Sequence, residues 1–298
     1  MTDRGPARTS EPVLIFAHRG ASKTYPEHTR AAYLEAIEQG ADGLETDVRL
    51  TADRQLVCWH DATTDRTTGV AGYVHQRTLE ELRALDVLRG ATVPDAFGSA
   101  DDQVLSLRQL LELMRSAPRA LRLALEIKQP GPFGSAVEEA VFRELDDLGW
   151  DPATGALGSV TIDLMCFWPQ TVEGLLDRLA PSLVMLLVED ASESDVAKWI
   201  EHETSGLLAG PAALDAAHSA AAIRQRLLET PGLGVGPDKK IVRTSPDLVR
   251  GWAATRRVRV WTVDSEADAD LCIDVGVREL TTNRPGALRA ALEEPTSA

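Results

Sequence analysis

The chain has 298 residues, of which 44% are hydrophobic, and a formal net charge of −15 at pH 7. This length is large for an ordinary domain but normal for a single α/β barrel, and the apolar content is sufficient for a sizeable core. A chain this acidic is not expected to bind nucleic acid or an anionic membrane, and if it handles a phosphate it must concentrate positive charge in one place.

The composition also indicates a compartment. Residues 1–11 are polar and have no apolar signal core, so a disordered N-terminal tail is expected there, followed by one domain over residues 12–298. No apolar run approaches the roughly 20 residues of a membrane span. Cys58, Cys166 and Cys272 each lie in or beside an apolar stretch, which favours buried free thiols. We expect a cytoplasmic protein without stable membrane insertion, whose oligomeric state the sequence leaves open.

Apolar runs alternate along the chain with stretches of helical period. A strand at 13–17 precedes an Ala-rich helix at 29–39, for which Thr29 is the expected N-cap. A strand at 43–48, a short apolar run at 55–59 and a helix at 107–115 follow. Further strands are expected at 121–127, 160–167, 182–188, 232–236, 258–263 and 278–282, and further helices at 135–148, 171–179, 195–203, 211–229, 246–255, 267–275 and 285–292.

This alternation predicts the fold class. With the run at 55–59 set aside, there are eight apolar strands, each followed by a helix, which is typical of a parallel sheet. Eight such units that close on themselves form a (β/α)8 TIM barrel, and an open doubly wound sheet is the alternative. Residues 61–104 contain no clear strand, so they are expected to form an insertion after the second strand.

Acidic side chains cluster where two of the predicted strands end, at the face where barrel enzymes place their active sites. Glu45 and Asp47 are two residues apart in GLETDV, so both point to the same side of the strand. Glu126 repeats the pattern in LEIK of the next strand. A polar strand face would explain one carboxylate, but three buried ones repel each other unless they are paired or bind a metal. Such all-oxygen ligands favour Mg²⁺ or Ca²⁺ over zinc.

Basic and titratable side chains accompany the acidic cluster. Arg19 follows the first strand, and Lys128 lies two residues after Glu126. Three carboxylates, a divalent cation and these two basic groups would together carry one net positive charge, which a phosphodiester would neutralise. His18 and His60 end the first strand and the run at 55–59, and imidazoles exchange protons near neutral pH. Trp261 lies near the tip of the seventh strand. A metal, a phosphate clamp and two imidazoles are the components of metal-assisted phosphoryl transfer.

Five segments together resemble a known family: AHRGASKTYPEHT, GADGLETDVRLTADRQLVCWHDATTDRTTG, LEIK, VRVWTVD and TTNRPGAL. In order and spacing, from about residue 13 to the end, they are similar to the motifs of glycerophosphodiester phosphodiesterases. The resemblance implies a TIM barrel with an insertion after the second strand. It also implies hydrolysis of a small glycerophosphodiester to sn-glycerol 3-phosphate and an alcohol, with a divalent cation.

The resemblance further implies a role for each candidate residue. The implied roles are acid/base catalysis for His18 and His60, phosphate contact for Arg19 and Lys128, metal binding for Glu45, Asp47 and Glu126, and substrate contact for Trp261, with Glu27 nearby. Two positions depart from the family. His28 replaces the usual Asn and is expected to support the loop and cap the next helix, and Cys166 replaces a small polar residue.

Two other functions remain open from the sequence. One is a phospholipase D-like hydrolase of lysophospholipids on the same barrel, and the other is a catalytically inactive phosphate-sensing protein. The presence of both histidines argues against the second. A lysolipid needs an apolar groove, but Leu79, Leu82 and Leu85 of the insertion recur at helical spacing and are expected to pack inward. A metal-dependent amidohydrolase is disfavoured because the first strand has no His-x-His pair.

Overall fold

Eight parallel strands form a barrel in the computed structural model, which describes residues 12–293. The strands are β1 (Leu14–His18), β2 (Gly43–Leu50), β4 (Leu121–Ile127), β6 (Val160–Cys166), β7 (Val184–Val188), β8 (Gly234–Pro237), β9 (Arg259–Val260) and β10 (Glu279–Thr282). Their order, β8-β7-β6-β4-β2-β1-β10-β9, is completed between β8 and β9 by isolated parallel bridges. The predicted TIM barrel is therefore confirmed, and the open doubly wound sheet is wrong. The tail predicted at 1–11 lies outside the described residues.

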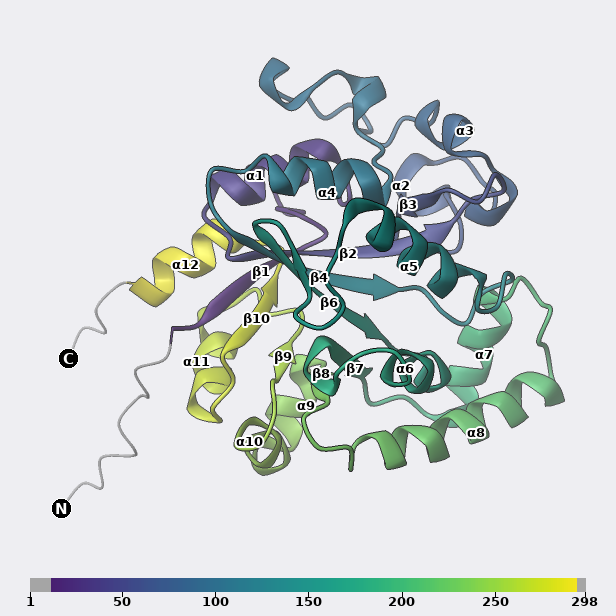
Figure 1. Ribbon diagram of the computed structural model, residues 1–298, viewed down its shortest axis with the longest axis vertical. Coiled ribbons are helices and arrows are strands. Elements are labelled where there is room, and N and C mark those ends of the chain that lie inside the picture. The colour runs from purple at the N-terminus through teal and green to yellow at the C-terminus, as the bar shows by residue number, and fades with distance from the viewer. Residues whose placement is uncertain (1–11, 294–298) are drawn as a thin grey trace.

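Helices cover the outside of the barrel (Figure 1). They are α1 (Arg30–Glu38), α4 (Leu107–Arg115), α5 (Ala136–Leu148), α6 (Pro169–Leu176), α7 (Glu193–Glu203), α8 (Pro211–Leu227), α9 (Lys239–Thr244), α10 (Pro246–Ala253), α11 (Glu266–Asp274) and α12 (Pro285–Glu293). The predicted N-cap is confirmed, because the Thr29 hydroxyl oxygen accepts a hydrogen bond from the Ala32 amide. The short helix α9 was not predicted. Within residues 12–293, no helix combines the length and the apolar character that a membrane crossing requires.

The segment predicted as an insertion lies beside the barrel mouth, at the upper right of Figure 1. The strand β3 (Leu56–Cys58), antiparallel to β2, leads into it, and it contains the short helices α2 (Asp65–Thr68) and α3 (Leu79–Arg83). Leu79 and Leu82 are buried in a separate small core, and Leu85 packs against that core. The predicted inward packing of these leucines is thus confirmed. The three cysteines are free and buried, also as predicted.

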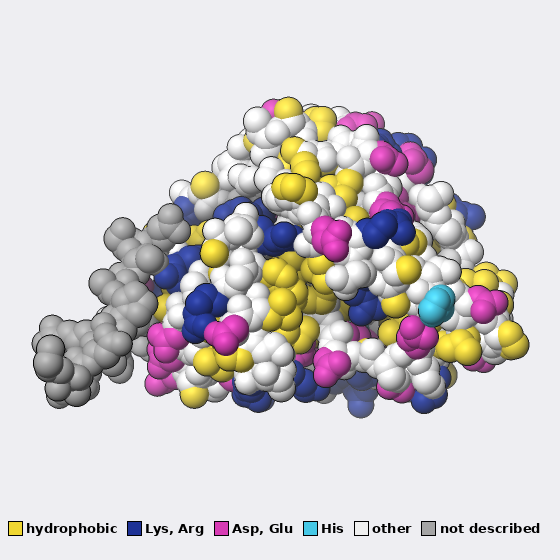
Figure 2. Space-filling view, turned by 90° about the horizontal axis from the view of Figure 1, so that it is seen from below, with side chains coloured by type: hydrophobic (Ala, Val, Ile, Leu, Met, Phe, Trp, Pro, Cys, Tyr) yellow, Lys and Arg dark blue, Asp and Glu magenta, His cyan; other side chains and the backbone are white. Residues whose placement is uncertain are grey.

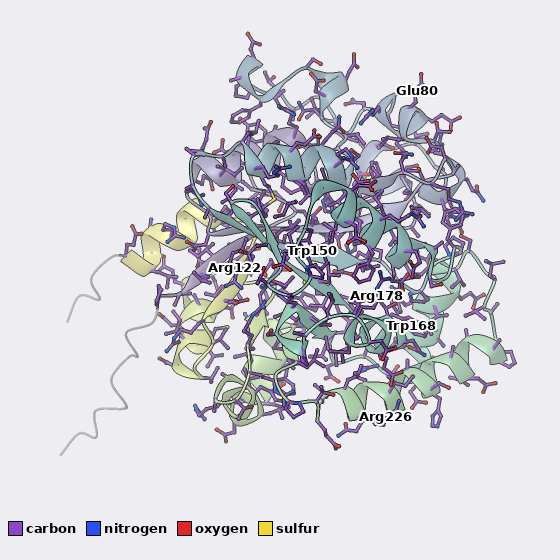
Figure 3. All side chains as sticks on the ribbon, in the orientation of Figure 1. Glu80, Arg122, Trp150, Trp168, Arg178 and Arg226 are labelled. Carbon is purple, nitrogen blue, oxygen red and sulfur yellow. The ribbon has the colours of Figure 1, made fainter. Side chains whose placement is uncertain are left out.

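Buried ion pairs fill the amino-terminal end of the barrel interior. The guanidinium of Arg259, which is 1% exposed, donates two hydrogen bonds to Asp163, at 3.0 and 2.9 Å, and one to Glu279, at 2.9 Å. It also lies 3.9 Å from the centre of the Phe16 ring. Arg122, another partner of Glu279, is labelled left of the centre in Figure 3, and Trp168 is labelled to the right. Because these ion pairs fill the amino-terminal end, the carboxyl end of the strands is where a ligand can enter the barrel.

Candidate active site

The strand register brings the three predicted acidic residues together at the carboxyl end of β1, β2 and β4. Glu45 is the register partner of His18, and Asp47 is the partner of Glu126. One oxygen from each carboxylate lies within 4.8 Å of the others, and the residues are only 2%, 0% and 6% exposed. The two-residue spacing on β2 thus points both acidic side chains inward, as predicted.

This crowding perturbs the ionisation of the cluster. Burial, together with the charge of Asp47, raises the pKa of Glu45 well above its usual range, and burial is also the main reason that the pKa of Glu126 rises to about 7. Burial opposes the ionisation of Asp47. The neighbouring Lys128, His60 and Arg19 nevertheless hold the pKa of Asp47 well below normal. The negative charge of the three carboxylates must therefore be balanced by bound protons or by cations.

A divalent cation fits this donor set. Asp47 Oδ1 is buried and has an ion-pair contact with Lys128 but no well-aligned hydrogen bond, and one oxygen of each of the three carboxylates lies within 4.8 Å of the others. An all-carboxylate site with no sulfur or imidazole ligand suits a hard cation of the Mg²⁺ or Ca²⁺ type.

The two predicted basic residues lie directly against the acidic cluster. The Lys128 ammonium is 2.6 Å from Glu126 Oε1 and 3.0 Å from Asp47 Oδ1. Arg19 Nε is 3.1 Å from Asp47 Oδ2, and its Nη1 donates to Glu27 at 3.0 Å. Glu27 also accepts two hydrogen bonds from Arg66 of the insertion, at 2.7 and 2.6 Å. Glu27 therefore orients Arg19 and ties the insertion to the rim.

A tight turn after β1 presents Arg19 to this cluster. Arg19 itself has a φ of 58°, in the left-handed region that non-glycine residues rarely occupy. Gly20 follows with a φ of 83°, and a Cβ there would lie 2.6 Å from the backbone carbon of Ala32 on α1. Glycine is required because α1 packs against the turn.

The two predicted histidines have different partners. His18 Nδ1 is 2.8 Å from Asn283 Oδ1, and the amide of Asn283 is oriented because its Nδ2 donates to Asp264 at 2.7 Å. The oxygen of Asn283 therefore faces His18, which must hold its proton on Nδ1. His60 Nδ1 is 2.6 Å from the Asp61 carboxylate, so it is also the donor. In both rings, Nε2 is the nitrogen left for a substrate.

These partners also set the ionisation of the imidazoles. Burial is the main reason that the pKa of His18 falls to about 3 and that of His60 to about 4. Arg19 lowers the pKa of His18 further, whereas Asp61 raises that of His60. Asp61 thus gives the His60 imidazolium an anionic partner, whereas the partner of His18 is a neutral amide.

These side chains open into one pocket of about 430 Å³ at the carboxyl end of the barrel. Of the predicted site residues, the pocket is lined by His18, Arg19, Glu45, His60, Glu126, Lys128 and Trp261, and Asp47 lies beneath it within the carboxylate cluster. Glu27 instead lines a neighbouring pocket of about 250 Å³, which shares His60. The structure thus brings the predicted residues to one mouth, with Glu27 at its edge.

The sequence profile of the glycerophosphoryl diester phosphodiesterase family matches residues 18–287. The chain belongs to this family. It is 35% identical to the probable glycerophosphodiester phosphodiesterase 1 of Mycobacterium tuberculosis over 94% of this chain and 93% of the relative. It is 28% identical to the glycerophosphodiester phosphodiesterase of Caldanaerobacter subterraneus over 93% and 96% of the two chains.

Solved structures of glycerophosphodiester phosphodiesterases share the fold. The phosphodiesterase of Oleispira antarctica, determined with sn-glycerol 3-phosphate, has a TM-score of 0.66 at 21% identity and covers 94% of this chain and 97% of its own. The Silicibacter pomeroyi protein, named a putative glycerophosphoryl diester phosphodiesterase, has a TM-score of 0.69 at 23% identity and covers 95% and 94%.

In this family member, His28 has a different position from the one expected. The helix cap is Thr29 alone. His28, which is 6% exposed, lies with Nε2 2.9 Å from Asp47 Oδ2 and with Nδ1 2.7 Å from the Tyr33 hydroxyl. The replacement of the usual Asn therefore keeps a polar side chain beside Asp47, and it orients that carboxylate.

Sequence reasoning missed several residues of the site. Asn283 and Asp61 lie in segments that carried the family resemblance, TTNRPGAL and WHD, so their positions next to the histidines could have been suspected. Trp168 and Trp199 line the same pocket but had no signal of that kind. Trp168 immediately precedes α6, and Trp199 lies on α7, so their place in the pocket depends on how these helices pack.

Proposed function

We propose that this protein hydrolyses glycerophosphodiesters to sn-glycerol 3-phosphate and an alcohol, with a divalent cation held by Glu45, Asp47 and Glu126. The observation that carries the proposal is the convergence of two imidazoles, two basic groups and three carboxylates on one pocket in a member of this family. When bound, the cation supplies charge neutralisation and polarisation of a phosphoryl oxygen.

The chain's own groups have separable roles in this proposal. Arg19 and Lys128 bind the non-bridging phosphoryl oxygens, where negative charge is concentrated. The Nε2 of His18 has a free lone pair and a neutral partner on Nδ1, so His18 acts as the general base.

His60 acts as the general acid. The Asp61 carboxylate stabilises the imidazolium of His60, in the way that a buried aspartate supports histidine in serine proteases. Protonated His60 therefore donates its Nε2 proton to the departing alkoxide.

The test is hydrolysis of glycerophosphocholine by the purified protein with Mg²⁺ or Ca²⁺ added, with sn-glycerol 3-phosphate and choline both quantified. A chelator should abolish the reaction, and either cation should restore it. The His18→Ala/His60→Ala double variant should be inactive. His218→Ala is the matched control because His218 lies on the exposed surface of α8 with a side chain that is 78% exposed. Full activity in excess chelator, or in the double variant, would contradict the proposal.

A further inference from the structure

The connection after β7 contains two helices, where a regular barrel unit has one. α7 and α8 pack against each other, and α8 also packs against α6 (Figure 1). α8 thus occupies the place of the ordinary barrel helix, and α7 is an addition at the mouth. In Figure 2, hydrophobic side chains gather at the right-hand end of the view, the end at which α7 and α8 meet in Figure 1.

This hairpin forms one wall of the catalytic pocket. From α7 come Val196 and Trp199, and from α8 comes Ala220. Trp168 faces them from the start of α6, with its ring centre 6.3 Å from that of Trp199. We call this set the hairpin wall. Its four side chains are apolar over most of their surface, and Trp199 and Trp168 are only half-buried.

A second aromatic pair joins the hairpin wall to the catalytic end. Phe167 and Trp261 meet edge to face with ring centres 5.3 Å apart. The Lys128 ammonium is 6.0 Å from the centre of the Phe167 ring. The apolar surface therefore begins next to the proposed phosphate-binding group.

The charges near the hairpin wall offset each other. Glu189 and Arg224 both line the pocket, and they are close enough for Arg224 to oppose the rise in the pKa of Glu189 that burial produces. Glu203 of α7 also lines the pocket and is paired with Arg49 at 2.7 Å, so carboxylates and guanidinium groups balance on this side. The hairpin wall can therefore discriminate between ligands by apolar contact and shape more than by charge.

A diester whose phosphate is bound by Arg19 and Lys128 must place one of its two substituents against this wall. The glycerol half has two hydroxyl groups, which would lose their hydrogen bonds to water against apolar side chains. The other alcohol is therefore the half that this surface can accept.

We infer that the α7–α8 hairpin forms a compartment for the leaving alcohol that selects bulky, weakly hydrated groups; this inference rests on the proposed function. The trimethylammonium group of choline has such a surface, because its charge is covered by methyl groups. The ammonium of ethanolamine would lose hydrogen bonds that the hairpin wall cannot replace. The predicted order is choline and its uncharged tert-butyl isostere, both above ethanolamine and glycerol.

The experiment measures kcat/KM for four diesters that share the glycerophosphoryl half. The alcohols are choline, 3,3-dimethylbutanol, ethanolamine and glycerol. The wild-type protein should cleave the first two at least about 10-fold more efficiently than the others, since differences of one or a few methyl-sized groups in an apolar pocket are worth about 10- to 200-fold. Equal rates on all four would overturn the inference alone. The inference would also be overturned if the choline ester were cleaved well but the 3,3-dimethylbutanol ester had a kcat/KM as low as that of the ethanolamine ester. Recognition would then depend on charge.

Variants of α7 distinguish a specificity role from a structural one. Trp199→Ala should reduce kcat/KM for the two bulky alcohols about 10-fold and leave the ethanolamine ester within about twofold. Val196→Thr preserves the shape and replaces a methyl group with a hydroxyl, so it should act in the same direction without creating a cavity. Lys198→Ala is the control on the same helix, with a side chain that is 74% exposed. An equal loss on all substrates would refute the inference, and failure of the wild type to cleave any diester would refute the proposed function beneath it.

Discussion

Removal of the His60 imidazole is expected to separate the two proton transfers of the proposed reaction. Burial lowers the pKa of both imidazoles, to about 4 for His60 and about 3 for His18. The Nδ1–H of His60 donates to the Asp61 carboxylate, whereas that of His18 donates to the neutral amide oxygen of Asn283. Of the two, His60 therefore has the anionic partner that stabilises an imidazolium, which is why we place it on the leaving group.

The assay compares two leaving groups. With glycerophosphocholine, His60→Ala should lower kcat by about 10²- to 10⁴-fold, the range for loss of a positioned general acid or base. With the 4-nitrophenyl ester of glycerol 3-phosphate, whose leaving group needs no proton, the same variant should lose less than about tenfold. His18→Ala should be slow on both substrates, and thermal melting should show that both variants are folded. Rescue of His18→Ala by the aryl ester, with His60→Ala remaining slow, would refute the assignment.

Three further outcomes are expected. His28→Leu should lower the free energy of unfolding by about 1–3 kcal/mol and should also weaken metal binding, because the Asp47 and Tyr33 oxygens lose their partner. His28→Asn should retain most of the stability and most of the metal affinity. Arg259 and Arg257 overcome the effect of burial and lower the pKa of Asp163 to about 2. Stability on the order of 2–3 kcal/mol at pH 7 should therefore be lost as the pH falls from about 5 to about 1, and urea unfolding of Asp163→Asn should show a smaller loss over that range. Glycerophosphocholine should be cleaved with higher kcat/KM than lysophosphatidylcholine because Leu79 and Leu82 of the insertion are buried; the reverse preference would favour the lysolipid hydrolase.

The barrel and the convergence of the candidate site residues were predictable from the sequence for a local reason. Side chains two apart on a strand share a side, so Glu45 and Asp47 had to point together, and strand order then places Glu126 and His18 beside them. The alternation of side chains and the parallel register are the same in every barrel of this kind. They are therefore sufficient to predict which charged groups meet at the ends of the strands.

The hairpin wall and the histidine partners could not be predicted in this way. Trp199 occupies one position on an acidic helix that looked like any other barrel crossover, and its role depends on how α7 packs over the mouth. Asn283 reaches His18 from 265 residues away, and its orientation depends on Asp264. The need for glycine at position 20 likewise arises from a distant element, because the backbone of α1 lies against the turn. Each of these depends on long-range packing that no periodicity encodes.

The position of Lys128 is expected to make metal binding and phosphate binding depend on each other in the proposed site. Its ammonium lies 2.6 Å from Glu126 and 3.0 Å from Asp47, so without a cation its charge is used to balance those carboxylates. A divalent cation in the same cluster would take over that balance and leave Lys128 for the phosphate. Calorimetric titration with sn-glycerol 3-phosphate should therefore give a Kd at least about tenfold weaker in chelator than in Mg²⁺ or Ca²⁺, about 1.4 kcal/mol of coupling.

Lys128→Met provides the test of this dependence. The variant should weaken product binding strongly when the metal is present and only slightly in chelator, where the lysine already serves the carboxylates. Arg19→Met is the comparison, since Arg19 is also held by Glu27, outside the metal cluster, and should contribute to phosphate binding under both conditions. An equal effect of Lys128→Met with and without metal would show that the ammonium is not shared between carboxylates and phosphate. The acidic cluster and the phosphate clamp would then be independent sites that happen to adjoin.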